Sequence, residues 1–205
     1  MNAIARLVLA SAAAAAISVA GVAAKQQSAQ QLLERGAFAE ATQRVQAERD
    51  AGNNDPASAY IAGQAYDRMN QNQQAREEYA RLSNGDDEAW KAVGQSAIAL
   101  LDGNLDEAVA EGTRARDING EHGFAHYQLG LALERRNDWN GAAEAFDRST
   151  QLMPNFAYAF YHAGVAHQRA RRFNQMAERF TTFLQLAPEA PERKIVQVAL
   201  NALRG

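Results

Sequence analysis

Apolar residues follow a helical spacing along most of the chain. Ala59, Ala62, Gly63 and Tyr66 recur at the i, i+3, i+4 and i+7 positions that face one side of an α-helix. A short polar stretch follows, and a similar spacing resumes at Ala75. No segment shows the sustained alternation that is typical of a strand. The pattern predicts an all-α protein of short antiparallel helix pairs.

The helix pairs repeat at a fixed interval. Counting back from Ala142 meets Ala108, Ala75 and Ala41 at intervals of 34, 33 and 34 residues, and the next step forward meets Met176. The turn before each of these positions has a similar sequence: ERGAFAEA, NQNQQA, DGNLDEA, NDWNGAA and RRFNQMA. Because one helix pair cannot bury its apolar face alone, units of this length must stack on their neighbours.

The two most similar copies keep their packing residues and change the polar ones. The kept pairs are Gly130 and Gly164, Trp139 and Phe173, Phe146 and Phe180, and Pro154 and Pro188. Gly inside a helix costs about 0.5–1 kcal/mol relative to Ala, so its recurrence indicates that another group approaches closely. We expect the small Ala of the second helix to supply that group. Each Pro separates the second helix from the next unit.

These residues resemble the tetratricopeptide repeat (TPR) family, whose pattern is matched by Leu129-Gly130, Ala142, Phe146 and Pro154. The resemblance covers roughly residues 30 to 188 and implies a right-handed superhelical solenoid of antiparallel helix pairs with a C-terminal capping helix. It divides the chain into a degenerate N-terminal pair at 25–54, repeats at 55–88, 89–122, 123–156 and 157–190, and a capping helix at 191–205.

The expected capping helix has its own apolar stripe. Ile195, Val198, Ala199 and Leu203 follow a helical spacing after Pro188. We expect this stripe to shield the last repeat from solvent, as terminal units of solenoids do.

Residues 1–24 form a different kind of segment. They combine Arg6 with an apolar run from Leu7 and small residues at Val22 and Ala24, the pattern of a secretory signal peptide cleaved before Lys25. Cleavage predicts a periplasmic or secreted protein without membrane insertion. The alternative is retention as an N-terminal membrane anchor, because the run carries no charge. Richness in alanine and the absence of cysteine favour a bacterial source.

Composition narrows the functional classes. The 205 residues are 47% hydrophobic and 22% charged, which is typical of a globular protein. With 21 basic and 24 acidic residues and no visible basic face, the chain does not suit nucleic acid. The absence of cysteine excludes disulfides and thiolate chemistry.

Candidate catalytic and metal-binding residues are sparse. The histidines are His122, His126, His162 and His167, and the second pair is five residues apart, which separates the two rings by about 140° around a helix. No serine has a nucleophile-elbow context, and there is no phosphate-binding glycine loop. The sequence therefore predicts no enzyme activity, no cofactor and no metal.

The TPR resemblance implies a concave groove lined by the first helix of each pair. Counting from the repeated glycines places aromatic residues on that face with basic residues at its edge. The expected partner-binding residues are Tyr60, Lys91, Phe124, Tyr127, Tyr158, Tyr161, Arg68, Arg135 and Arg169. Rigid aromatics and Arg are typical of binding hot spots. We expect exposed rings at Tyr127 and Tyr161 above all, although packing between repeats is the alternative.

The sequence thus predicts a non-catalytic interaction scaffold or adaptor that binds a peptide segment of a cell-envelope partner. The Lys and Asn pattern with which some TPR domains clamp acidic chaperone tails is absent, because the matching slots hold Tyr60 with Gln64, Ala92, and Phe124 with Gln128. The alternative function is an accessory subunit that delivers a small ligand or metal to an envelope enzyme, and the histidines are the feature in its favour.

Overall fold

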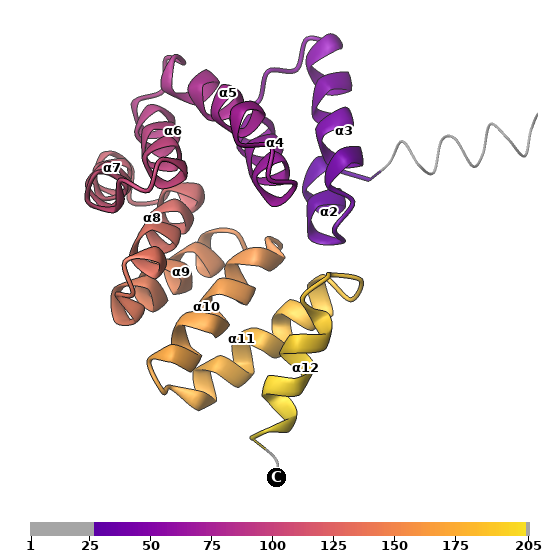
Figure 1. Ribbon diagram of the computed structural model, residues 1–205, viewed down its shortest axis with the longest axis vertical. Helices are drawn as coiled ribbons and strands as arrows, with labels where there is room; N and C mark the ends of the chain where they lie inside the picture. The colour runs from indigo at the N-terminus through magenta and orange to yellow at the C-terminus, as the bar shows by residue number, and fades with distance from the viewer. Residues whose placement is uncertain (1–26, 204–205) are drawn as a thin grey trace, which may run out of the picture.

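The computed structural model describes residues 27–203 (Figure 1). The expected signal peptide therefore lies outside the described residues. Eleven helices make up the described chain, and no strand occurs within 27–203. Their bounds are α2 Ala29–Glu34, α3 Phe38–Asp50, α4 Pro56–Arg68, α5 Asn72–Ser83, α6 Glu88–Leu101, α7 Leu105–Ile118, α8 Gly123–Arg135, α9 Trp139–Leu152, α10 Ala157–Arg169, α11 Phe173–Leu186 and α12 Arg193–Asn201.

Consecutive helices pack as pairs, and the pairs stack along a curved path (Figure 1). The main contacts run from α2 to α3, from α4 to α5, from α6 to α7, from α8 to α9 and from α10 to α11, and then between neighbouring pairs. The first helix of one pair also contacts the first helix of the next, as α6 contacts α8. The predicted all-α solenoid of antiparallel helix pairs is confirmed.

The helix starts are set by local sequence. Asp55, Asp87 and Asp138 precede α4, α6 and α9, and each side chain accepts a backbone hydrogen bond from the first turn of the helix. Ser28 forms a capping box with Gln31 at the start of α2. Such caps satisfy amide groups that have no partner inside the helix.

The turn inside each helix pair contains one residue with a positive φ. These residues are Gly36, Asn70, Gly103, Asn137 and Arg171, with φ between 57° and 82°. They recur at the repeat interval, two residues before the first residue of each second helix. Since only Gly adopts this conformation without steric cost, and Asn tolerates it better than most residues, Arg171 is the strained member of the set.

The repeated glycines of the first helices receive the aromatic rings of the second helices. A Cβ atom at Gly63, Gly130 or Gly164 would lie 2.3–2.6 Å from a ring atom of Tyr79, Phe146 or Phe180 respectively. The prediction of a close approach is confirmed. The prediction that the small Ala of the second helix supplies the approaching group is wrong, because an aromatic ring does so. Glycine is needed because a flat ring presses on the backbone of the neighbouring helix.

The terminal helix α12 packs against α11 through a narrower face than the sequence suggests. Val196 is buried, whereas Ile195 and Val198 remain 66% and 68% exposed. Of the expected stripe, Ala199 packs against the core of the last repeat, and the buried contact beside it is made by Val196 in place of Ile195 and Val198.

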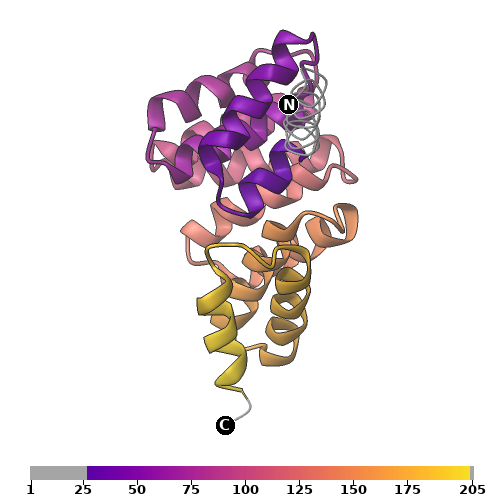
Figure 2. The same ribbon diagram turned by 90° about the vertical axis from the view of Figure 1, so that its right-hand side faces the viewer.

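The curvature brings the two ends of the solenoid together. Gln30 Nε2 donates to the backbone oxygen of Asn155 at 2.9 Å, and Arg68 Nη1 donates to Glu192 Oε1 at 2.5 Å. Figure 1 shows α2 facing α10 and the segment before α12, and Figure 2 shows the early units beside the late ones from a second direction. These contacts close the curved row of helices into a ring.

Candidate functional site

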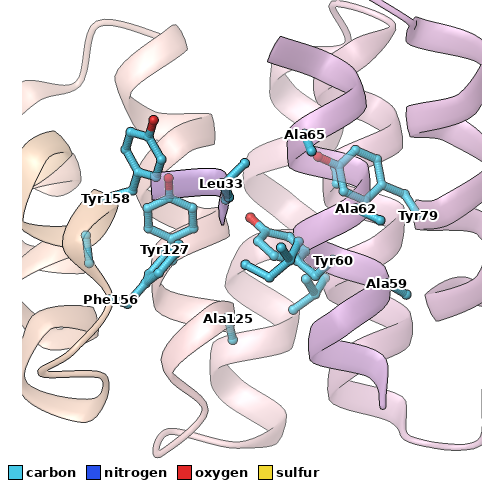
Figure 3. Close-up of a cluster of buried hydrophobic side chains, with 14 of the residues drawn as sticks. Leu33, Ala59, Tyr60, Ala62, Ala65, Tyr79, Ala125, Tyr127, Phe156 and Tyr158 are labelled. Atoms are coloured by element: carbon cyan, nitrogen blue, oxygen red, sulfur yellow. The ribbon is translucent and has the colours of Figure 1, made fainter. Parts of the chain in front are cut away.

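The concave face is filled by side chains of the protein itself. Tyr60 of α4, Tyr127 of α8 and Tyr158 of α10 are at most 1% exposed and form one cluster with Leu33 and Phe156. In Figure 3 the Leu33 side chain lies between the rings of Tyr127 and Tyr158 and the ring of Tyr60. The expectation of exposed rings is therefore wrong at Tyr60, Tyr127 and Tyr158, because α2 enters the concave side and covers them.

The buried tyrosines take part in a ring cluster and a polar chain. Tyr60 lies 5.8 Å from Tyr79 and 6.3 Å from Tyr127 between ring centroids. Its hydroxyl donates to Gln128 Oε1 at 2.7 Å, and Gln64 Nε2 donates to the Tyr79 hydroxyl at 3.0 Å. Burial raises the pKa of Tyr60, Tyr79 and Tyr127 well above the ordinary value. These phenols are neutral structural groups.

A cavity of about 480 Å³ remains beside this cluster. Its lining comes from α4, α5, α6, α8, α10 and the residue before α12. The lining residues are Gln64, Asp67, Arg68, Asn70, Asn72, Tyr79, Ala97, Leu100, Leu101, Gln128, Leu131, Glu134, Arg135, Tyr161, His162, Val165 and Glu192. Among the expected groove residues, Arg68, Arg135 and Tyr161 meet here.

Charges of both signs surround the cavity. Arg68 is held between Glu192 and the Tyr158 ring, whose centroid is 4.5 Å from the guanidinium carbon. His162 Nδ1 lies 2.9 Å from Glu134 Oε2. Asp67 and Arg135 are exposed on the rim, and partial burial raises the pKa of Asp67 against the opposing effect of the Arg135 charge. The cavity can pair polar or charged groups of either sign.

Lys91, Phe124 and Arg169 do not line this cavity. Lys91 Nζ pairs with Glu88 at 2.6 Å, and the Arg169 guanidinium carbon lies 5.4 Å from the Trp139 ring centroid. The Phe124 ring is partly buried, 5.1 Å from the Tyr60 ring. The structure therefore divides the expected groove set into a buried cluster with Phe124 at its edge, a cavity group, and Lys91 and Arg169 in neither.

Sequence reasoning missed the acidic and amide groups of the cavity. Asp67 and Glu134 each lie four residues after a repeated glycine, Gly63 or Gly130. That shared repeat position was the signal that could have found them. Glu192 had no such signal, because it belongs to the segment that follows the last repeat.

The four histidines serve separate structural contacts. His122 accepts from the backbone N–H of Ala125 at the start of α8, and burial lowers its pKa. The ring of His126 lies 2.9 Å from the Gly120 oxygen, and His167 Nε2 lies 3.0 Å from Asp147 Oδ2. Within residues 27–203, no group of three or more His, Asp or Glu side chains is placed to hold a metal ion.

The described part of the chain contains no helix with the length and apolar character needed to cross a membrane.

Comparison with known proteins agrees with this architecture. The family described as tetratricopeptide repeat matches residues 123–156. No curated protein matches the chain. The first TPR domain of Spaghetti (RPAP3), bound to the HSP90 peptide SRMEEVD, aligns at 17% identity with a TM-score of 0.55, covering 58% of this chain and 94% of that one. The TPR domain of Arabidopsis OM64 aligns at 17% identity with a TM-score of 0.53, covering 56% and 95%.

Residues 123–156 thus match the tetratricopeptide repeat family, and the helix pairs of the described chain have the fold of solved tetratricopeptide repeat domains. Gly130 and Phe146, one of the glycine and aromatic pairs, lie within the matched segment.

Proposed function

We propose that the protein is a non-catalytic scaffold that binds a peptide segment of a cell-envelope partner at its concave face. The main observation in support is the polar cavity of about 480 Å³ on that face, with Asp67 and Arg135 exposed at its rim. Pockets of this size hold small ligands or a few side chains. The Spaghetti domain, which has the same fold, binds its HSP90 peptide.

The chemistry of the cavity favours a peptide with mixed polar and charged groups. Arg68 is already paired with Glu192, and Glu134 faces His162. Gln64 and Gln128, which occupy slots that an acidic-tail clamp would fill with other residues, hydrogen-bond to the buried tyrosines. An incoming acidic tail would therefore meet Asp67, Glu134 and Glu192 as well as the two arginines.

A random dodecapeptide library selected against residues 25–205 tests this proposal. Enriched peptides are expected to lose at least about tenfold in affinity, roughly 1.4 kcal/mol, when the rim is altered by Asp67→Lys together with Arg135→Glu. The matched control is Glu144→Lys with Arg136→Glu, because both residues are exposed and neither lines the cavity. Peptides that bind the rim variant and the control equally would place binding elsewhere, and the absence of enriched peptides would refute the proposal.

The proposed location is the periplasm or the secreted fraction, after removal of residues 1–24. N-terminal sequencing of the mature protein is expected to start at Lys25. A start at Met1 in a membrane fraction would instead support the anchored alternative.

A further inference from the structure

The two halves of the solenoid are joined by a small set of contacts across the concave face. Glu34 Oε1 accepts from the backbone N–H of Ala157 at 2.8 Å, a contact between residues 123 positions apart. Gln30 reaches the oxygen of Asn155 beside it, and Arg68 reaches Glu192 on the far side of the ring. We call these contacts the latch.

The latch keeps apolar surface covered. Leu33, on the same short helix as Glu34, is 1% exposed and packs in the cluster of Tyr127, Phe156 and Tyr158. The turn at Gly36 meets Pro191, since a Cβ atom on Gly36 would lie 2.6 Å from Pro191 Cγ. Opening the latch would expose the aromatic surface that the sequence places on a TPR groove.

The closed ring keeps a partner away from the aromatic cluster. Tyr60, Tyr127 and Tyr158 are at most 1% exposed, so the cavity of about 480 Å³ offers a partner its polar lining but not these three rings. A longer segment that packs along these rings needs the ring of helices to open.

The architecture allows such opening without unpacking any repeat. Each unit of a solenoid contacts its neighbours alone, and its curvature is the sum of small rotations between units. A slight change at each junction would separate α2 from Ala157 and Arg68 from Glu192 while leaving the glycine and aromatic packing intact. Water replaces the hydrogen bonds of the latch when they separate, whereas the exposure of Leu33 and the buried rings costs free energy that a bound partner offsets by covering them again.

We propose that the latch is a size-selective closure of the binding face: the closed ring admits a short segment, and a longer partner segment binds only after the latch opens. This inference rests on the proposed peptide-binding function and specifies how that site is regulated. A ligand that binds the open form better shifts the population toward it.

A covalent lock tests the closure, and the absence of native cysteine makes labelling clean. In the locked form, Gln30→Cys and Asn155→Cys are bridged by a short bis-maleimide. The matched control bridges Glu121→Cys to Arg148→Cys, a pair in hydrogen-bond contact between adjacent repeats and outside the cavity. Peptides of twelve residues selected on the unbridged protein are expected to bind the locked form at least about tenfold more weakly, and to bind the control unchanged.

A second measurement judges the latch without any ligand. Spin labels at Gln43→Cys on α3 and Glu189→Cys after α11, both exposed positions, report the distance between the two ends. At low salt we expect one population of label-to-label distances. In 1 M NaCl, which screens the Arg68–Glu192 ion pair, we expect a second population with a longer distance. An unchanged distance, together with equal peptide binding by locked and unlocked forms, would overturn the latch. Failure of all peptides to bind the unlocked protein would count against the proposed function, and the distances would still decide the latch.

Discussion

The Glu34 carboxyl group caps α10 from another repeat. Phe156 holds the N-cap position of α10 and offers no side-chain hydrogen bond, while Glu34 Oε1 accepts from the Ala157 N–H at 2.8 Å. Gln30 Nε2 donates to the same oxygen at 3.0 Å. A carboxyl oxygen at a helix N-terminus satisfies an amide without an intrahelical partner. The first helix pair thus stabilises the last repeat directly.

Removing this acceptor should destabilise the protein. Glu34→Ala leaves the buried Ala157 N–H without its partner, which costs about 1–3 kcal/mol. Glu34→Gln keeps an acceptor oxygen and should cost less than about 1 kcal/mol. Urea denaturation at pH 6 measures both free energies of unfolding, and equal losses for the two variants would contradict the capping role.

Stability should fall as pH rises toward neutrality. Burial raises the pKa of Glu34 to about 7 from 4.5, against the effect of its hydrogen bonds to Ala157 and Gln30. Between these values the folded protein keeps a proton that the unfolded chain releases, so the stability conferred by the protonated group is complete below about pH 4.5 and is lost as pH approaches 7. The loss is on the order of 3 kcal/mol.

Denaturation curves from pH 4.5 to 8 measure this slope. Tyr158, which also senses the Glu34 charge, has its pKa raised by burial and does not titrate in that window. Glu34→Gln should flatten the profile, whereas Glu189→Gln at an exposed position should leave it as in the wild type. A slope that survives Glu34→Gln would assign the dependence to another group.

The repeat itself could be predicted because its packing is local. Gly164 and Phe180 lie 16 residues apart and meet within one helix pair. The recurrence of this spacing in the sequence therefore indicates the repeat. The choice of partner could not be predicted, since both Ala and an aromatic residue occur on the second helix. Which of them faces the glycine depends on the rotation of the two helices about their axes.

The glycine and aromatic contact yields a sharp stability test. Gly164→Ala would place Cβ 2.3 Å from a ring atom of Phe180. Ala gains about 1 kcal/mol in helix propensity, but overpacking typically costs about 1–3 kcal/mol, and a ring wedged against a backbone has little room to move. We expect a net loss of about 1–2 kcal/mol in thermal or urea unfolding. Gly120→Ala, with no atom within 4 Å of its Cβ, should change stability by less than about 0.5 kcal/mol.

Burial separates the roles of two tyrosines that the sequence treats alike. Tyr127 is 1% exposed, whereas Tyr161 is half-buried and lines the cavity. Tyr127→Ala should lose about 3–5 kcal/mol of stability, as large aromatic truncations in cores do. Tyr161→Ala should lose less than half of that. Equal losses, measured by urea denaturation, would contradict the buried cluster.

The candidate site was only partly predictable because it depends on the sum of many junctions. Arg135 and Tyr161 could be placed on the inner face from their distance to a glycine. The burial of Tyr127 could not, because Leu33 reaches it after the chain has turned through several repeats. Small rotations between units accumulate over that distance, and the sequence pattern of one repeat does not contain them.

The turn residue Arg171 provides the last prediction. It has a φ of 59° at the position where other repeats hold Gly36 or Gly103, and a Cβ-bearing residue pays about 1–2 kcal/mol for this conformation. Glycine avoids that cost but loses more entropy on folding, so Arg171→Gly should stabilise the protein by roughly 0.5–1 kcal/mol. Arg171→Ala, which removes the same charge but keeps Cβ, should not be stabilising. Thermal unfolding at matched pH compares the two, and an equal gain for both would trace the effect to the exposed side chain of Arg171 instead of its backbone.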